Sequence, residues 1–126
     1  MKRVMVVDDS ETARMFVQRC LEAIGLAGAE FVEAADGKEA LEKLKAEPVD
    51  LVVTDLTMPE MNGESLLMRI KASPKLTMIP VLVISSAGNM AKAKDLTNQG
   101  AIGVLAKPFS PAELYTMLQP IMGAGG

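Results

Sequence analysis

The sequence predicts an α/β fold, a single doubly wound parallel sheet of five strands flanked by five helices. Short apolar runs rich in branched residues recur along the chain, as in strands that are buried on both faces of a sheet. Between them lie segments whose apolar residues repeat with the period of a helix. Strand and helix alternate five times in 126 residues, without an internal repeat or a linker. This order predicts right-handed crossovers and one domain.

The five predicted strands are too short to be buried helices. The first, third and fourth are uninterrupted apolar runs, and the fifth includes Gly103. The second contains only Phe31 and Val32 as large apolar residues, so we expect it near an edge of the sheet. In chain order the strands are residues 4–7, 29–34, 51–53, 81–84 and 102–105.

The predicted helices each carry an apolar stripe for packing against the sheet. Four stripes are well populated and lie within residues 13–24, 37–44, 63–70 and 114–121. The stretch at residues 89–99 is weaker, because Met90, Ala93 and Leu96 are its only expected inward positions.

Capping signals agree with these helices. Ser10 can cap the first helix and Gly25 can end it, while Asp36 and Glu39 have the spacing of a capping box. The best signal is the segment 110–113, which places a serine cap, a proline at the first helical position and a glutamate at the third.

Composition excludes several kinds of function. A net charge of −3 argues against nucleic acid as a partner. The absence of histidine removes histidine-based catalysis and histidine-ligated metals, so a bound metal would use oxygen ligands and favour Mg²⁺, Mn²⁺ or Ca²⁺. A single cysteine, Cys20, indicates a reducing compartment, and the apolar run at residues 4–7 is too short for a signal peptide or a membrane span. We therefore expect a soluble cytoplasmic protein.

Polar residues capable of chemistry follow four of the predicted strands. They are Asp8 and Asp9, Asp55, Ser85, and Lys107. Since the carboxyl ends of parallel strands share one edge, we expect these side chains to lie together. At an effective dielectric constant of about 20, each close pair of carboxylates costs a few kcal/mol without a cation. A divalent metal, of which Mg²⁺ leaves most room for phosphate oxygens, would relieve this repulsion.

Each of these residues also has an ordinary structural interpretation. An aspartate after a strand is often a helix cap or a turn former, Lys107 could be a solvated surface lysine, and Ser85 could bond to backbone. The loop at residues 58–63 could simply lead into a helix. Their convergence on one edge is what favours a functional site.

Four segments together resemble the receiver domains of response regulators in two-component signalling, the CheY-like family. They occur in the family's order, and the likeness extends from Lys2 to about Met122. The segments are VVDDS at 6–10, TDLTMPEMNG at 54–63, ISSAG at 84–88 and AKPFSPAEL at 106–114. The resemblance implies a flavodoxin-like sheet with strand order 2-1-3-4-5 over residues 1–122, followed by a flexible glycine-rich tail at residues 123–126.

The resemblance also implies a role for each site residue. Asp55 would accept a phosphoryl group from a partner histidine kinase or phosphotransfer protein, and Ser85 and Lys107 would bind that group. Asp8, Asp9 and Asp55, with the backbone carbonyl of Thr57, would hold Mg²⁺. The family also leads us to expect a cis peptide bond before Pro108.

By the same resemblance, a stand-alone receiver signals by binding a downstream protein through the fourth helix, fifth strand and fifth helix. We expect a phosphoprotein that turns over no external substrate and acts as a monomer. Many members carry an aromatic switch residue three positions before the lysine, but this chain has Val104 there. The two positions that tune phosphoryl lifetime in the family are Thr57 and Ala87.

Two other functions share parts of this pattern. A Mg²⁺-dependent phosphatase with an aspartate nucleophile would also use Asp55, but such enzymes usually have a second acid where this chain has Thr57. A flavin carrier would share the alternating architecture, but three Phe, one Tyr and no Trp leave few rings to flank a flavin. Asp8 and Asp9 would also repel its phosphate.

Overall fold

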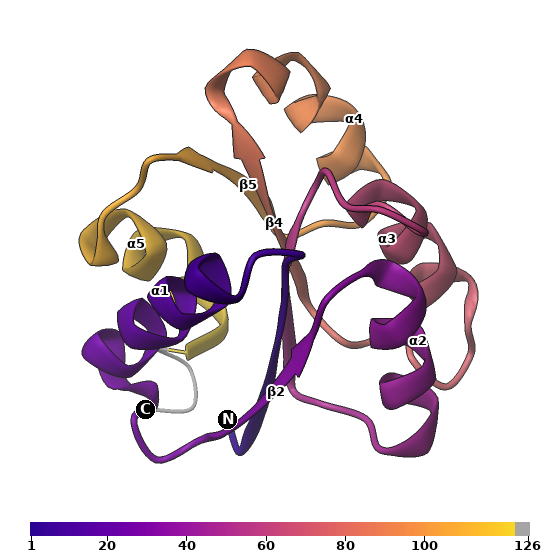
Figure 1. The fold of residues 1–126 in the computed structure, drawn as a ribbon, viewed down its shortest axis with the longest axis horizontal. Coiled ribbons are helices and arrows are strands. Elements are labelled where there is room, and N and C mark those ends of the chain that lie inside the picture. Colours follow the sequence, from indigo (N-terminus) through magenta and orange to yellow (C-terminus); the bar gives the residue numbers. More distant parts are fainter. Residues whose placement is uncertain (123–126) are drawn as a thin grey trace.

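Five parallel strands form one sheet in the order β2-β1-β3-β4-β5, which confirms the predicted order (Figure 1). The computed structural model describes residues 1–122, and the predicted tail at residues 123–126 lies outside the described residues. As expected, the weak second strand lies at one edge, and β5 lies at the other. The strands are β1 (Arg3–Val7), β2 (Glu30–Ala34), β3 (Leu51–Asp55), β4 (Val81–Ser86) and β5 (Gly103–Lys107).

Helices cover both faces of the sheet. In Figure 1, α1 and α5 lie on one side of the strands, whereas α2, α3 and α4 lie on the other. Within residues 1–122 no helix combines the length and the apolar character needed to cross a membrane. The helices are α1 (Glu11–Leu21), α2 (Gly37–Ala46), α3 (Gly63–Ala72), α4 (Ala93–Asn98) and α5 (Pro111–Met122).

The strands divide the core into two layers because successive side chains of a strand point to opposite faces. Val4 and Val6 pack into the layer that includes residues of α1 and α5, such as Leu21. Met5 and Val7 pack into the opposite layer, with residues of α2, α3 and α4. The strands β1, β3 and β4 are buried on both faces, which explains the uninterrupted apolar runs in the sequence.

Two helices differ from the sequence prediction. After α1 the chain makes an irregular turn over Glu22–Leu26. The helical backbone is interrupted there at Gly25, whose φ of 122° is a left-handed conformation that suits glycine and agrees with its predicted role in ending the helix. The expected fourth helix is split into a 3₁₀ segment, η2 (Ala87–Lys92), and the short α4. As predicted, Leu96 is buried and Met90 and Ala93 pack partly against the core.

The predicted caps are present. The hydroxyl of Ser10 accepts a hydrogen bond from the Ala13 amide at 3.2 Å. Ser110 and Glu113 form the reciprocal pair of a capping box, at 3.2 and 3.1 Å. At α2, Asp36 caps the helix as predicted, because its Oδ1 accepts from the Glu39 amide at 2.8 Å. The Glu39 carboxylate, however, accepts from the amide of Ala35 and not from that of Asp36.

Candidate functional site

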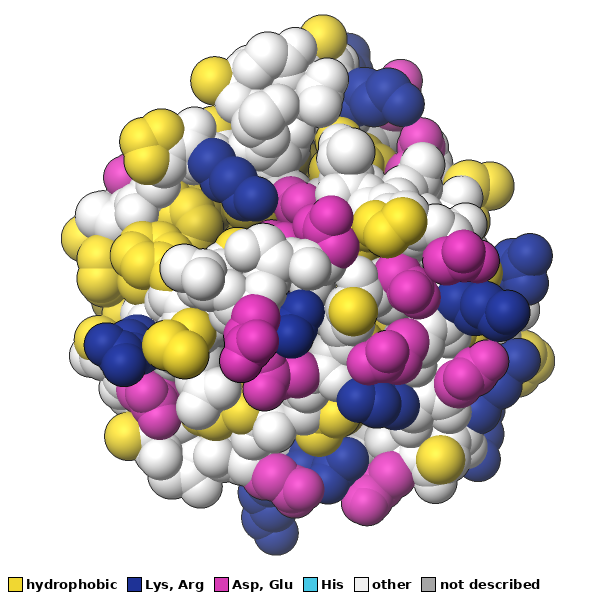
Figure 2. All heavy atoms as spheres, viewed as in Figure 1, with side chains coloured by type: hydrophobic (Ala, Val, Ile, Leu, Met, Phe, Trp, Pro, Cys, Tyr) yellow, Lys and Arg dark blue, Asp and Glu magenta, His cyan; other side chains and the backbone are white. Residues whose placement is uncertain are grey.

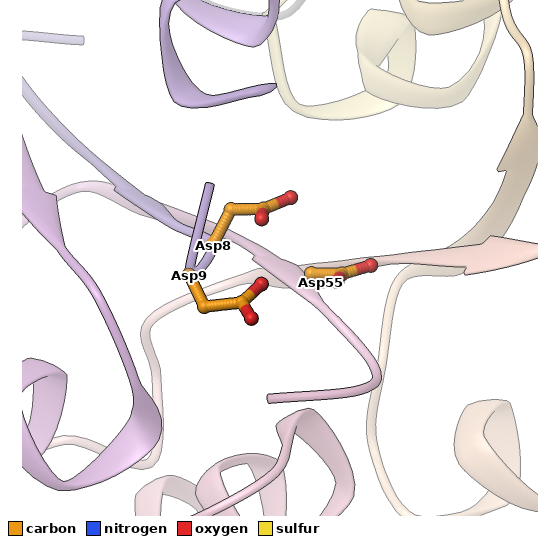
Figure 3. Close-up of side chains that lie close together, drawn as sticks. All are labelled: Asp8, Asp9 and Asp55. Carbon is orange, nitrogen blue, oxygen red and sulfur yellow. The ribbon is translucent and has the colours of Figure 1, made fainter. Parts of the chain in front are cut away.

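Three carboxylates meet at the carboxyl edge of the sheet. Asp8 and Asp9 follow β1, and Asp55 is the last residue of β3, the neighbouring parallel strand. One carboxylate oxygen from each lies within 4.8 Å of the others. Figure 3 shows the three side chains at the ends of these two strands. Such a group of oxygen donors could hold a hard divalent cation.

The strands extend further than the apolar runs suggest, so three of the predicted residues lie within strands and not after them. Asp55, Ser85 and Lys107 are all paired in the ladder; for example, Asp55 lies opposite Ile84 and Ser85 opposite Ala106. Backbone hydrogen bonds of the sheet therefore fix the position of each of these residues.

Lys107 reaches across β4 to the acidic group. Its Nζ lies 3.2 Å from Oδ1 of Asp55 and 3.5 Å from Oδ2 of Asp8. The ammonium thus supplies part of the cationic charge that the sequence analysis assigns to a metal alone. Three carboxylates and one ammonium still leave an excess of negative charge, which favours a further cation.

The pKa values of these groups move in directions that follow from their surroundings. Burial, and then the neighbouring Asp8 carboxylate, raise the pKa of Asp55 above the ordinary aspartate value, although Lys107 opposes this. Burial opposes the charge of Lys107, but the attraction of Asp55 and Asp8 outweighs it and raises the pKa of the ammonium. The carboxylates therefore stabilise the charge of Lys107 on balance, whereas the charge of Asp55 is disfavoured on balance despite the ammonium.

Ser85 lies beside this group without joining it. Its side chain is fully buried, and its Oγ donates a hydrogen bond to the carbonyl of Ser86 at 3.1 Å. That bond is the ordinary structural role considered for this serine in the sequence analysis. The hydroxyl would have to give up this bond to donate its proton to a group bound at Asp55.

The remaining predicted positions line the approach to the site. Thr57 is exposed in the loop after β3 and borders a cleft with Asn62, Asn89 and Lys92. Ala87 is exposed at the start of η2. The peptide bond between Lys107 and Pro108 is cis, as the resemblance led us to expect.

Gly63 has a role at the site that the sequence analysis did not find. There it counts only as part of the helical stripe and as the last residue of the segment at 54–63, but its amide donates to the carbonyl of Leu56 at 2.8 Å. A Cβ at this position would collide with the backbone of Asp55. Only glycine therefore lets α3 begin directly behind the backbone of Asp55.

Arg14 was also missed. It lies in α1 beside the apolar stripe, and its side chain is only 15% exposed. Its Nη1 donates to the backbone carbonyl of Asp8 at 2.6 Å, and its Nε donates to Glu33 at 2.8 Å. A charged residue at the margin of a buried helix face, one turn after the acidic pair, was the available signal.

An apolar cleft of about 580 Å³ adjoins the acidic group. Phe16 of α1 and Phe109 after β5 meet edge to face across it, with ring centroids 5.4 Å apart. Asp8 and Lys107 also border this cleft. Figure 2 shows the hydrophobic side chains gathered over α1 and α5, beside acidic groups near the middle of the view.

The fold and the acidic edge agree with a comparison against known families. Residues 4–119 match the model of the response regulator receiver domain. The chain belongs to this family of two-component signalling proteins.

Its relatives are of the CheY type. The chain is 33% identical to a chemotaxis protein CheY homolog of Campylobacter jejuni, over 98% of this chain and 94% of the relative. It is 36% identical to chemotaxis protein CheY-3 of Vibrio cholerae, over 94% and 90%. The crystal structure of the chemotaxis response regulator CheY4 of Vibrio cholerae superposes with a TM-score of 0.82, at 33% identity, and the match covers 97% of this chain and 99% of that one.

Proposed function

We propose that this CheY-like receiver accepts a phosphoryl group on Asp55 and signals by phosphorylation-dependent protein binding. The donor would be the phosphohistidine of a histidine kinase or phosphotransfer protein. The observation that carries this proposal is the position of the Asp55 carboxylate, 3.2 Å from the Lys107 ammonium and grouped with two further acids.

The transfer is a substitution at phosphorus. A carboxylate oxygen of Asp55 attacks, a new P–O bond forms, and the P–N bond to the donor imidazole breaks with its electron pair left on nitrogen. Lys107, whose ammonium lies 3.2 Å from Asp55, would neutralise charge on the phosphoryl oxygens during this step. The adjoining apolar cleft offers a surface on which the donor protein could rest.

We propose Mg²⁺ as the cofactor. Asp8, Asp9 and Asp55 would hold it together with the backbone carbonyl of Thr57, and this set of oxygen donors fits a hard cation. When bound, Mg²⁺ would neutralise negative charge on the carboxylates and on the incoming phosphoryl group.

Ser85 and Lys107 would then couple phosphorylation of Asp55 to a conformational change in the rest of the domain. Ser85 would exchange its bond to the Ser86 carbonyl for one to the phosphoryl oxygen, and the following loop would move with it. We propose that the surface of α4, β5 and α5 binds the downstream protein. Val104 is buried under this surface, so the response would proceed without an aromatic switch.

We propose that residues 1–122 act as one monomeric receiver in the cytoplasm. The lone Cys20, buried in the α1 layer, is consistent with a reducing compartment.

The test is phosphorylation by a small phosphodonor such as acetyl phosphate. We expect wild-type protein to take up one acid-labile phosphoryl group in the presence of Mg²⁺, and Asp55→Asn to reduce labelling to background because an amide is a poor nucleophile. Asp50→Asn is the matched control, since Asp50 lies outside the acidic group and an amide can still accept its backbone bonds. Full labelling of Asp55→Asn would contradict the assignment.

The same preparation separates a receiver from a phosphatase. A receiver turns over slowly, through its own acyl phosphate, whereas a phosphatase would release phosphate continuously from an excess of an aryl phosphate. Sustained multiple turnover of such a substrate, lost in Asp55→Asn, would favour the phosphatase.

A further inference from the structure

We propose that Arg14 is a positioning residue, whose guanidinium fixes the peptide between Asp8 and Asp9 so that Asp9 faces a divalent cation. The inference rests on the proposed function, because it assigns Asp9 to the metal site. It assigns a role to a residue outside the acidic group, which touches neither the phosphoryl group nor the metal.

Arg14 joins three elements of the fold. Its Nη1 donates to the carbonyl oxygen of Asp8 at 2.6 Å, and its Nε donates to Oε1 of Glu33, on the edge strand β2, at 2.8 Å. Two donors of one rigid, planar group are thus engaged in different directions, which leaves the guanidinium little freedom to turn. The backbone carbonyl of Glu33 is in turn bonded by Lys43 of α2.

The four polar groups of Asp8 are all engaged. Its amide donates to Ala34 at 3.1 Å, its carbonyl accepts from Arg14, Oδ1 accepts from the Ser10 amide at 2.9 Å, and Oδ2 lies 3.5 Å from Lys107. Three of these partners hold the residue before or beside the turn. Arg14 is the one that holds the oxygen of the peptide leading into Asp9.

Asp9 depends on that peptide for its direction. Asp9 is exposed, and within residues 1–122 its carboxylate has no hydrogen-bond or ion-pair partner that would orient it. Rotation about the Cα–C bond of Asp8 would turn this carbonyl and move the Asp9 Cα–Cβ bond with it, while leaving β1 intact. Holding the carbonyl oxygen therefore restrains the carboxylate without occupying either of its oxygens.

A positive charge close to a cation site could instead weaken metal binding. Two observations argue against that effect here. The Arg14 guanidinium forms an ion pair with Glu33, so the pair carries no net charge. Arg14 also binds a carbonyl, whereas Lys107 contacts the carboxylates directly and is the group that competes with a metal for them. The orienting effect of Arg14 on Asp9 should therefore outweigh the repulsion between the guanidinium and the metal ion.

The experiment measures Mg²⁺ binding to metal-free protein by calorimetry. We expect Arg14→Ala to raise the dissociation constant roughly tenfold, at the low end of what loss of an outer-shell partner costs a metal site. Arg14→Lys keeps the charge but cannot bridge both partners, so it should restore only part of the affinity. Arg19→Ala removes the same charge from an exposed position of α1 and should leave the constant unchanged.

A second readout separates positioning from general stability. In metal-free protein, NMR relaxation should show the Asp9 amide loosening in Arg14→Ala, from an order parameter of about 0.85 towards 0.6, but not in Arg19→Ala. Glu33→Gln should also weaken Mg²⁺ binding and lower the Asp9 order parameter, but by less. This variant keeps the Arg14 side chain, so it tests the proposal even if Arg14→Ala folds poorly.

Wild-type protein that binds no Mg²⁺ would overturn the proposed function itself. If wild type binds Mg²⁺, equal or tighter binding by Arg14→Ala overturns the inference alone. A weaker Arg14→Ala complex with an unchanged Asp9 order parameter also overturns it, because the residue would then act only through stability.

Discussion

The two sides of the acidic site are built differently. On the β1 side, every polar group of Asp8 has a partner, and the helix that follows is capped by Ser10. That helix, α1, buries Val17, Cys20 and Leu21 against the sheet. This side is held by hydrogen bonds at the turn and by packing behind it.

On the β4 side, the chain leaves the sheet at Ser86 into a segment with little support. The 3₁₀ segment η2 has no buried residue and no side-chain cap, and a Cβ at Gly88 would meet no atom within 4 Å. The short helix α4 that follows buries only Leu96. Polar contacts from Glu64 of α3, to Lys92 at 3.3 Å and Gln99 at 3.0 Å, tie this segment to its neighbour.

This difference fits two separate roles, ligand binding on the β1 side and conformational change on the β4 side. A site that binds a metal and a phosphoryl group benefits from preorganised ligands, because disorder there would lower affinity. A segment that must change shape benefits from few buried contacts, because a differential interaction of only a few kcal/mol can then shift its population. The rigid side would hold the metal beside Asp55, and the loosely held side would move when Asp55 is phosphorylated.

The largest effect should come from a phosphoryl mimic. With beryllofluoride and Mg²⁺, hydrogen exchange should change chiefly in residues 86–115 and little in residues 10–50. Asp55→Asn should abolish the change, because the mimic binds at that carboxylate. Changes concentrated in residues 10–50 would show that the β1 side is the one that responds, and would contradict the proposed output surface.

Lys107→Ala should separate the two sides. The protein should keep some phosphorylation by acetyl phosphate, since Asp55 and the acidic group remain, but lose most of the hydrogen-exchange response in residues 86–115. The ammonium is the contact that joins the acceptor to β5 and the loop after it. Lys75→Ala, at an exposed position, is the control. A full response in Lys107→Ala would show that Ser85 alone carries the signal.

Asp9→Ala tests whether Asp9, on the β1 side, contributes to the stability of the metal-free protein. Removing one of three close carboxylates relieves repulsion, so the metal-free variant should unfold at the same temperature as wild type or slightly above it. Added Mg²⁺ should stabilise the wild type but scarcely affect the variant, as ligand binding to the native state requires. A clear fall in the unfolding temperature of the metal-free variant would mean that Asp9 is a structural residue of the turn.

The smallest effect concerns the tie between α3 and α4. Hydrogen bonds from Gln99 and Lys92 lower the pKa of Glu64. A lowered folded-state pKa stabilises the docked segment above the unfolded pKa of Glu64, and this stabilisation is lost as the pH falls from the unfolded value through the lowered one. The Gln99 side-chain amide signal should titrate there by NMR.

Glu64→Gln should remove that titration and loosen residues 87–99 by about 0.5 kcal/mol at neutral pH, as for other partly exposed pairs. Glu42→Gln, at an exposed position of α2, should do neither. An unchanged Gln99 titration in Glu64→Gln would mean that another carboxylate holds the segment.

The sequence alone predicted the fold well, because the fold class depends on the order of strands and helices, and these can be recognised from patterns of neighbouring residues. Branched apolar runs such as residues 81–84 indicate strands buried on both faces, and the capping box at Ser110 and Glu113 fixes where a helix begins. The thin stripe around Leu96 correctly marked the least buried helix. It did not show that the segment splits into η2 and α4, because weak periodicity fits both kinds of helix.

The sequence could predict which residues gather at the candidate site, because they lie at strand ends that share one edge of the sheet. Parallel topology alone brings the ends of β1, β3, β4 and β5 to one edge, so the grouping of Asp8, Asp9 and Asp55 followed from the order of strands. That Lys107 already lies between two of these carboxylates, and that Ser85 is turned towards the backbone, depends on side-chain rotamers.

The tertiary structure alone decided the contacts between residues distant in the chain. Arg14 meets Glu33 and the Asp8 carbonyl only because α1 and β2 flank β1, and Gly63 is required only because α3 starts against the backbone of Asp55. Periodicity and capping depend on neighbours within a few residues and can be read from the sequence. A side chain that supports the site from another element is selected by close packing in three dimensions, which leaves no local pattern in the sequence.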